Sequence, residues 1–322
     1  VLRILGLGGD KKFINFLNEQ LMITNQCKAN EAPFLSASAG LSYPNLINYY
    51  APGGMIEIPK TLLSFIQKHG GSYKNKSEVM SVRKVSDGTA EKVWEVKTKH
   101  DTFYCFDLIS NIPIWNLESL FTSKEPSIEG ISKMYEKGIW GAFTMGIAME
   151  ADLAGEECLH HQIHLSEPIP FGGGDSIFVS ISHKDDLVRS KDGIRILSIS
   201  THLSDPETWN RKDPDYQIKK RQIEAIVITA LSDTFPWFQK NKIAFQHSAT
   251  PVTWQTWTGR KFGRVGGIPS FYFRNPFRYL SSLSGIPNFY LTGDTVYPGQ
   301  GIPAVCIGGI NLANRLIRTK RD

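Results

Sequence analysis

The sequence predicts an α+β fold, in which helices are combined with sheets of mixed strand direction. Three observations predict it. Short strand-like runs follow one another in the first part of the chain, at 79–85, 92–98 and 102–110. Longer runs that are typical of one sheet precede an amphipathic helix, at 139–149, 176–182, 194–201 and 213–235. The chain closes on a strand, a Gly/Pro-rich loop and a helix, at 288–291, 292–302 and 303–317.

The helices are predicted from the spacing of apolar residues and from proline and glycine at their ends. Residues 11–26 are expected to be helical because their apolar side chains recur at helical spacing: Phe13, Ile14, Phe16, Leu17, Leu21 and Met22. Pro59 opens a second helix that Gly70 and Gly71 end. Between these two helices, short helical turns and loops are predicted for residues 32–50. The amphipathic helix predicted at 213–235 is capped by Asp213-Pro214 and ended by Pro236.

One tight turn and one further strand-like segment are also predicted. Asp87-Gly88 is a tight turn between the first two strand-like runs. Residues 243–256 are also expected to be strand-like.

Composition excludes several classes of protein. The net charge is only +5 and Lys and Arg are scattered, which argues against a nucleic-acid partner. The cysteines are far apart, which argues against a zinc site or a disulfide scaffold and fits a reducing compartment: Cys27, Cys105, Cys158 and Cys306. No apolar stretch is long enough for a membrane-spanning helix. Cytoplasmic or peripheral membrane localisation is expected.

Three further features have both a functional and a structural interpretation. The histidines His160, His161 and His164 suggest a metal, but no other ligand stands at suitable spacing, so a surface loop is favoured and no metal site is expected. The run Gly172–Gly174 could be a phosphate-binding loop, but it lacks the Lys-Ser/Thr pair that such a loop carries. A flexible loop is therefore favoured. An aromatic cluster could line a channel for a long substrate or simply pack in the core: Trp254, Trp257, Phe262, Phe271, Tyr272 and Phe273.

The stretch that most clearly indicates a functional site is Leu291–Val305. Its strand ends in Gly293-Asp294, and a loop with Pro298, Gly299 and Gly301 leads to a helix. Glycines let the backbone approach a flat ligand where a Cβ atom would clash. Pro303 suits the first turn of that helix, whose N-terminus offers N–H groups and partial positive charge. Asp294 is suited to accept hydrogen bonds from a ligand hydroxyl or from loop amides.

These residues carry a family resemblance. The pattern Gly293-Asp294-x-x-x-Pro298-Gly299-x-Gly301-Ile302-Pro303 resembles the C-terminal flavin motif of phytoene desaturases, carotenoid isomerases and retinol saturases. Two other segments also resemble that family: Pro52-Gly53-Gly54-Met55 through Val79, and Thr250-Pro251 through Gly266-Gly267-Ile268-Pro269. The resemblance covers most of the chain and implies an FAD-dependent oxidoreductase of the amine oxidase superfamily.

One departure is that the family's opening strand–GxGxxG–helix segment is not recognisable. Leu5-Gly6-Leu7-Gly8-Gly9 has Lys11 at the sixth motif position, and no second strand precedes Glu31. We therefore expect an incomplete α/β flavin-binding fold, and expect these 322 residues alone to bind FAD weakly or not at all and to be inactive. A smaller departure is Gly308, where many relatives have serine.

The resemblance implies four regions: a helical part of the substrate region at 1–50, parts of the FAD-binding domain at 51–119 and 281–322, and a mixed-sheet substrate domain at 120–280. The implied cofactor contacts are Val79, Gly293, Asp294, Pro298, Gly299, Gly301, Ile302, Pro303 and Val305. No residue stands out as a catalytic acid or base.

The implied substrate is a hydrophobic isoprenoid polyene, which would be desaturated, saturated or isomerised, and which makes peripheral membrane contact plausible. Two alternatives stay open. One is a flavin amine oxidase, and the other is a non-catalytic lipid-binding relative similar to the Rab GDP-dissociation inhibitors. The oligomeric state is not predicted.

Overall fold

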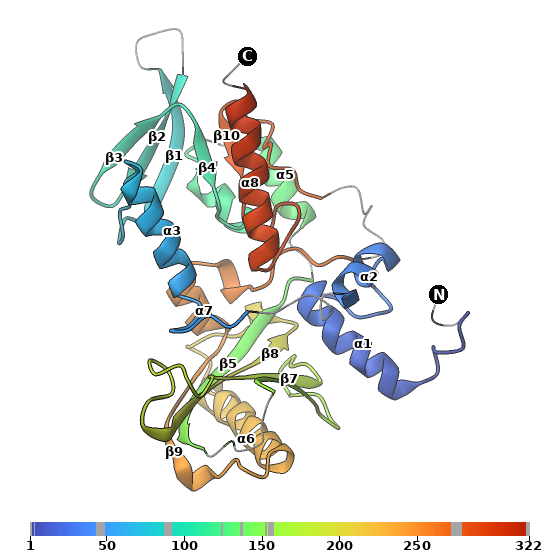
Figure 1. Ribbon diagram of the computed structural model, residues 1–322. Helices are drawn as coiled ribbons and strands as arrows, with labels where there is room; N and C mark the ends of the chain where they lie inside the picture. The colour runs from blue at the N-terminus through green and yellow to red at the C-terminus, as the bar shows by residue number, and fades with distance from the viewer. Residues whose placement is uncertain are drawn as a thin grey trace. The chain divides into compact units, whose positions relative to one another are not determined.

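The computed structural model describes residue 2 and residues 4–42, 49–86, 92–123, 125–135, 138–151, 153, 158–271 and 279–319. The chain divides into two units, one built from residues 1–43, 74–139 and 266–322 and the other from residues 44–73 and 140–265. Helices and sheets occur in both units, which agrees with the predicted combination of helices and sheets (Figure 1).

The first unit contains five helices among its described residues. They are α1 (Lys11–Thr24), α2 (Phe34–Ser42), α4 (Ile114–Leu117), α5 (Pro126–Met134) and α8 (Ile302–Thr319). The unit also has an antiparallel sheet in the order β1-β2-β3, from β1 (Val79–Ser86), β2 (Lys92–Thr98) and β3 (Thr102–Cys105). A separate parallel pair joins β4 (Leu108–Ser110) to β10 (Phe289–Leu291). A core of large apolar side chains, including Trp94, Trp115 and Phe289, joins β2, α4, α5 and β10.

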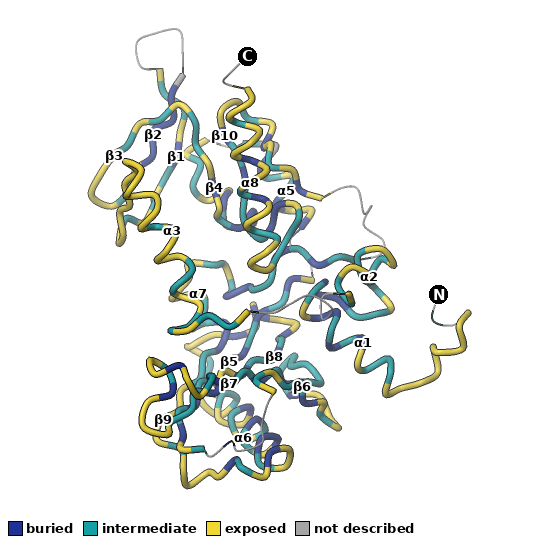
Figure 2. Tube along the Cα trace, in the orientation of Figure 1, coloured by how far each residue is buried: buried dark blue, intermediate teal, exposed yellow. Residues whose placement is uncertain are grey.

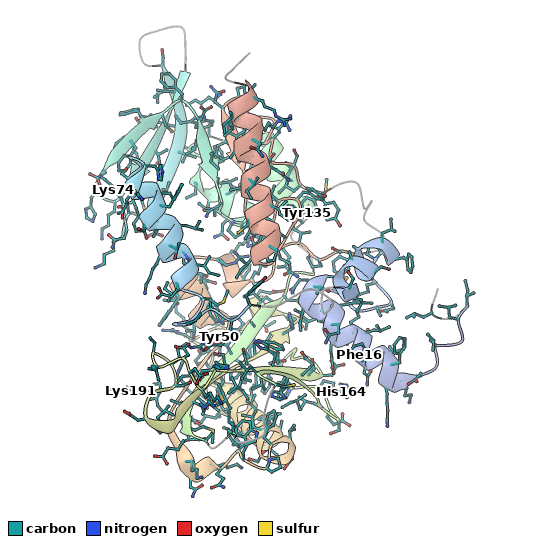
Figure 3. All side chains as sticks on the ribbon, viewed as in Figure 1. Phe16, Tyr50, Lys74, Tyr135, His164 and Lys191 are labelled. Carbon is teal, nitrogen blue, oxygen red and sulfur yellow. The ribbon has the colours of Figure 1, made fainter. Side chains whose placement is uncertain are left out.

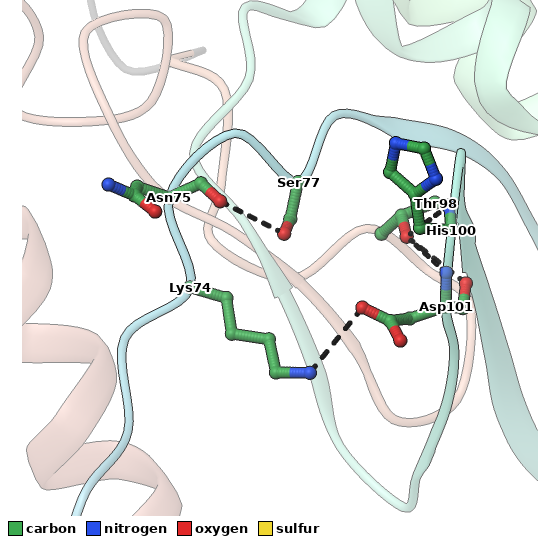
Figure 4. Close-up of polar contacts among 6 residues, drawn as sticks. All are labelled: Lys74, Asn75, Ser77, Thr98, His100 and Asp101. Atoms are coloured by element: carbon green, nitrogen blue, oxygen red, sulfur yellow. Dashed lines mark hydrogen bonds and ion pairs between the residues drawn. The ribbon is translucent and has the colours of Figure 1, made fainter.

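Local chemistry explains the sharp turn from β2 to β3 (Figure 4). The backbone N–H of Thr98 donates to the carbonyl of Asp101, and the Asp101 N–H donates to the Thr98 hydroxyl, both at 2.9 Å. Lys74 adds an exposed ion pair to the Asp101 carboxylate at 3.4 Å. Side-chain hydrogen bonds of this kind offer the backbone a turn in place of a continued strand.

The second unit is built around a five-stranded antiparallel sheet in the order β6-β7-β8-β5-β9. Its strands are β5 (Gly141–Glu150), β6 (His160–His164), β7 (Ser176–Ile181), β8 (Ile194–Leu203) and β9 (Ile243–Ala249). Its helices are α3 (Glu57–Lys68), α6 (Tyr216–Thr234) and α7 (Pro251–Thr258). Burial alternates strictly along β5, and α6 packs its buried side chains into the same core as the inward residues of β5, β7 and β8 (Figures 1 and 2).

Three sequence predictions need correction. The run 102–110 is not one strand, because the chain breaks at Phe106-Asp107 and β4 pairs with β10 instead of continuing β3. Residues 251–256 are helical, because Thr250 and Thr253 form a capping box and Pro251 occupies the first turn of α7. The histidines predicted to lie in a surface loop form strand β6 (Figure 3).

In that strand, Ser180 of β7 hydrogen-bonds the His160 ring at 2.9 Å, and burial lowers the pKa of His160. No metal-binding group of side chains occurs among the described residues. The Asp87-Gly88 turn and two members of the aromatic cluster, Tyr272 and Phe273, lie outside the residues that the structure describes. No helix in the described part of the chain combines the length and hydropathy needed to cross a membrane.

Candidate cofactor site

The predicted loop lies between β10 and the first turn of α8, as its sequence suggests. The predicted site residues from Gly293 to Val305 lie in this loop or in the first turn of α8, whereas Val79 lies at the start of β1 in the three-stranded sheet. Three of the loop glycines have backbone angles that favour glycine, with φ of 99° at Gly293, 117° at Gly299 and 86° at Gly301. The chain therefore needs glycine at the positions that the motif specifies.

The two ends of the loop differ in how closely the backbone is packed. A Cβ atom at Gly293 would lie 3.0 Å from the carbonyl oxygen of Asn111, so this glycine fits against a neighbouring loop. At Gly299 and Gly301 an added Cβ would meet no atom within 4 Å. Gly293 thus allows close packing inside the protein, and the other two leave the backbone accessible from outside.

Hydrogen bonds from separate parts of the chain fix the loop. The N–H of Thr292 donates to the carbonyl of Ser110 at 2.9 Å, and that of Tyr297 donates to Leu280 at 2.9 Å. The N–H of Ile114 donates to the buried Thr295 hydroxyl at 3.4 Å. The loop is therefore positioned by its surroundings as well as by its own sequence.

Helix α8 begins at the end of this loop without an acidic residue in its first turn. Gly301, Ile302 and Pro303 are exposed, and Val305 is half-buried. The N–H of Val305 donates to the Gly301 carbonyl at 3.0 Å and so closes the first turn. The positive end of the helix macrodipole therefore lies beside the accessible glycine backbone, where it favours negative charge.

The segment that sequence resemblance placed before this strand lies directly against the loop. Gly267 has a φ of 73°, and a Cβ atom there would lie 2.2 Å from the carbonyl oxygen of Asp294. Its neighbour Gly266 similarly faces the side chains of Gln26 and Gln300. The Gly-Gly pair therefore lets two backbone segments of the same unit approach more closely than side chains allow.

Sequence reasoning missed the contribution of the C-terminal end of α1 and of Asn25, the residue that follows it. A pocket beside the loop encloses about 690 Å³ of empty space, including the solvent at its mouth, and is lined by Thr24, Asn25, Tyr135, Asp294, Pro298 and Gly299 among others. Gln300 connects the loop to the end of α1, because its amide donates to the carbonyl of Ile23 at 2.9 Å. Ordinary polar residues such as Thr24 and Asn25 carry no motif, so the sequence offered no signal for them.

Comparison with known proteins supports the resemblance. No family model matches the chain. Over 330 residues the chain is 28% identical to the chloroplastic prolycopene isomerase of Arabidopsis thaliana, a match that covers 95% of this chain and 52% of that protein. The chain thus spans about half the length of the curated relatives that it matches.

Solved structures show the same fold. An oxidoreductase from Methanosarcina mazei matches with a TM-score of 0.61 and 14% identity, over 97% of this chain and 67% of that one. A putrescine oxidase bound to putrescine matches with a TM-score of 0.59 and 11% identity, over 98% of this chain and 67% of that one. The chain is therefore similar to carotenoid isomerases along almost its whole length and has the fold of these oxidoreductases, as the sequence predicted.

Proposed function

We propose that residues 1–322 form the larger part of the cofactor and substrate sites of an FAD-dependent enzyme that isomerises an isoprenoid polyene. The observation that carries this proposal is the accessible glycine backbone of Gly299 and Gly301 at the N-terminus of α8. The similarity to prolycopene isomerases supports the reaction and the substrate class.

The residues of the loop fit a flat, electron-rich ring. The open space beside Gly299 and Gly301 allows a ring to lie against the backbone, which a side chain at either position would prevent. The positive end of α8 favours a ring that carries negative charge. When bound, FAD would supply two-electron redox chemistry at its isoalloxazine ring.

The chain's own residues have positioning roles in this proposal. Asp294 would accept hydrogen bonds from the ribityl part of a bound FAD, and the backbone of Val79 would contact its adenine end. Residues 51–119 and 281–322 belong to the flavin domain, and residues 120–280 to the substrate domain. The aromatic side chains Trp254 and Trp257 of α7 belong to that substrate domain.

The flavin assignment is tested on the protein as its gene encodes it. We expect the purified protein to show a flavin absorption spectrum, and Asp294→Ala to lower FAD occupancy at least several-fold. Asp233→Ala is the matched control, because it removes an exposed carboxylate from the end of α6 in the other unit. A colourless protein that takes up no added FAD would contradict the assignment and favour the lipid-binding alternative.

Substrate assays then separate the flavin enzymes from one another. Conversion of a cis-polyene to its trans isomer, with no change in the number of double bonds, supports the proposal. A change in that number would indicate desaturation or saturation instead. Depletion of amines without any reaction of polyenes would assign the protein to the amine oxidases.

We also propose peripheral contact with a membrane, because a polyene substrate partitions into lipid. Sedimentation with liposomes tests this contact. Protein that stays in the supernatant at low ionic strength would contradict it.

A further inference from the structure

Helix α3 is amphipathic, yet none of its twelve residues is buried (Figure 2). Its apolar face has side chains at helical spacing, namely Ile58, Leu62, Phe65 and Ile66. Leu62 is 55% exposed and Phe65 is 62% exposed. A helix of this length is only marginally stable in water without packing on its apolar face. The apolar face of α3 therefore requires a covering.

A second exposed apolar segment is tied to the residues just before α3. The buried carboxylate of Asp186 accepts hydrogen bonds from the Tyr50 hydroxyl at 2.7 Å and from the Gly53 N–H at 3.0 Å. These bonds hold the loop of residues 183–190 against that of residues 50–54. Beside them, both segments expose aliphatic side chains, namely Met55, Ile56, Leu187 and Val188. Leu187 is 75% exposed and Val188 is 80% exposed.

Basic side chains are interspersed with these apolar ones. Residues 55–69 and 183–192 contain five of them, Lys60, Lys68, Lys184, Arg189 and Lys191. The same residues contain four acidic side chains, Glu57, Asp185, Asp186 and Asp192, of which Asp186 is buried. The surface charges therefore have a cationic excess. Protruding apolar side chains bordered by Lys and Arg are typical of an element that lies in the interface of a membrane with anionic lipid.

We propose that α3 with Met55 and Ile56, together with Leu187 and Val188, forms the surface by which this protein binds a bilayer that contains anionic lipid. The proposal rests on the peripheral membrane contact proposed above and assigns that contact to named residues. A bilayer fits this surface because acyl chains accommodate side chains that protrude from a helix and from a loop, while lipid headgroups pair with the bordering cations.

The test is co-sedimentation of the protein, as its gene encodes it, with vesicles of phosphatidylcholine and phosphatidylglycerol. The double variant Phe65→Gln with Leu187→Gln should lower the partition coefficient at least about ten-fold, because two inserted apolar side chains are lost. Ile218→Gln is the matched control, since Ile218 is 62% exposed on α6 of the same unit. The control should sediment like the unaltered protein. Flavin absorption is read in parallel, so that loss of cofactor and loss of membrane binding are told apart.

Hydrogen exchange provides a second measurement that needs no substitution. Amides of α3 should exchange at least about ten-fold more slowly with vesicles than without them, whereas amides of α6 should be unchanged. A double variant that sediments like the unaltered protein would overturn the assignment of the surface and leave the membrane contact itself intact. Unaltered protein that stays in the supernatant would overturn both.

The Tm in the absence of vesicles decides whether a protein segment is the occupant instead. The double variant should keep the Tm of the unaltered protein, because both side chains are exposed when no lipid is present. A lower Tm, with the control unaffected, would mean that another part of the polypeptide covers these side chains, and would overturn the proposal.

Discussion

Replacing Gly267 by alanine tests whether close backbone packing positions the loop before α8. Gly267 has a φ of 73°, and the added Cβ atom would lie 2.2 Å from the Asp294 carbonyl oxygen and 3.1 Å from its carbon. A left-handed conformation costs a non-glycine residue about 1–2 kcal/mol. Relieving the clash requires a backbone shift of roughly an ångström, and overpacking of this kind costs about 1–3 kcal/mol more. We therefore expect a total destabilisation of about 2–5 kcal/mol.

Gly285→Ala is the matched control for this prediction. Gly285 lies in the same unit with a φ of 81°, but its added Cβ would meet no atom within 4 Å. This control should therefore cost only the conformational term of about 1–2 kcal/mol. Urea unfolding of both variants measures the difference between them. If Gly267→Ala is no more destabilising than Gly285→Ala, then the contact with Asp294 does not constrain the loop.

Three other changes test separate parts of the fold. The ion pair with Arg83, whose Nε lies 2.6 Å from the carboxylate, lowers the pKa of buried Glu95 to about 2. The stabilisation should therefore be complete above about pH 4.5 and disappear as the pH falls toward 2, and Glu95→Gln should weaken that part of the pH dependence of unfolding. Tyr50→Phe removes a 2.7 Å hydrogen bond that lowers the pKa of Asp186, so this pKa should rise and amides of the 51–54 loop should exchange roughly ten-fold faster. An alanine at Gly309 meets no atom within 4 Å, so in residues 1–322 it should stabilise α8 by about 0.5–1 kcal/mol in urea unfolding.

The elements that the sequence predicts well are those specified by local chemistry. Pro303 and the preceding glycines mark where α8 begins, and the apolar spacing between Lys11 and Thr24 specifies α1. The glycine motif also predicts the loop correctly, because positive φ angles at Gly293, Gly299 and Gly301 demand that residue type. These features need no knowledge of distant contacts.

The elements that the sequence mispredicts depend on partners far away in the chain. The β-prone run 102–110 divides because β4 pairs with β10, which lies about 180 residues later, and hydrophobic periodicity carries no information about pairing. The histidines of β6 look like a polar loop, yet their strand forms because β7 offers a complete ladder from His160 to His164. Thr24 and Asn25 reach the candidate site only through the tertiary fold.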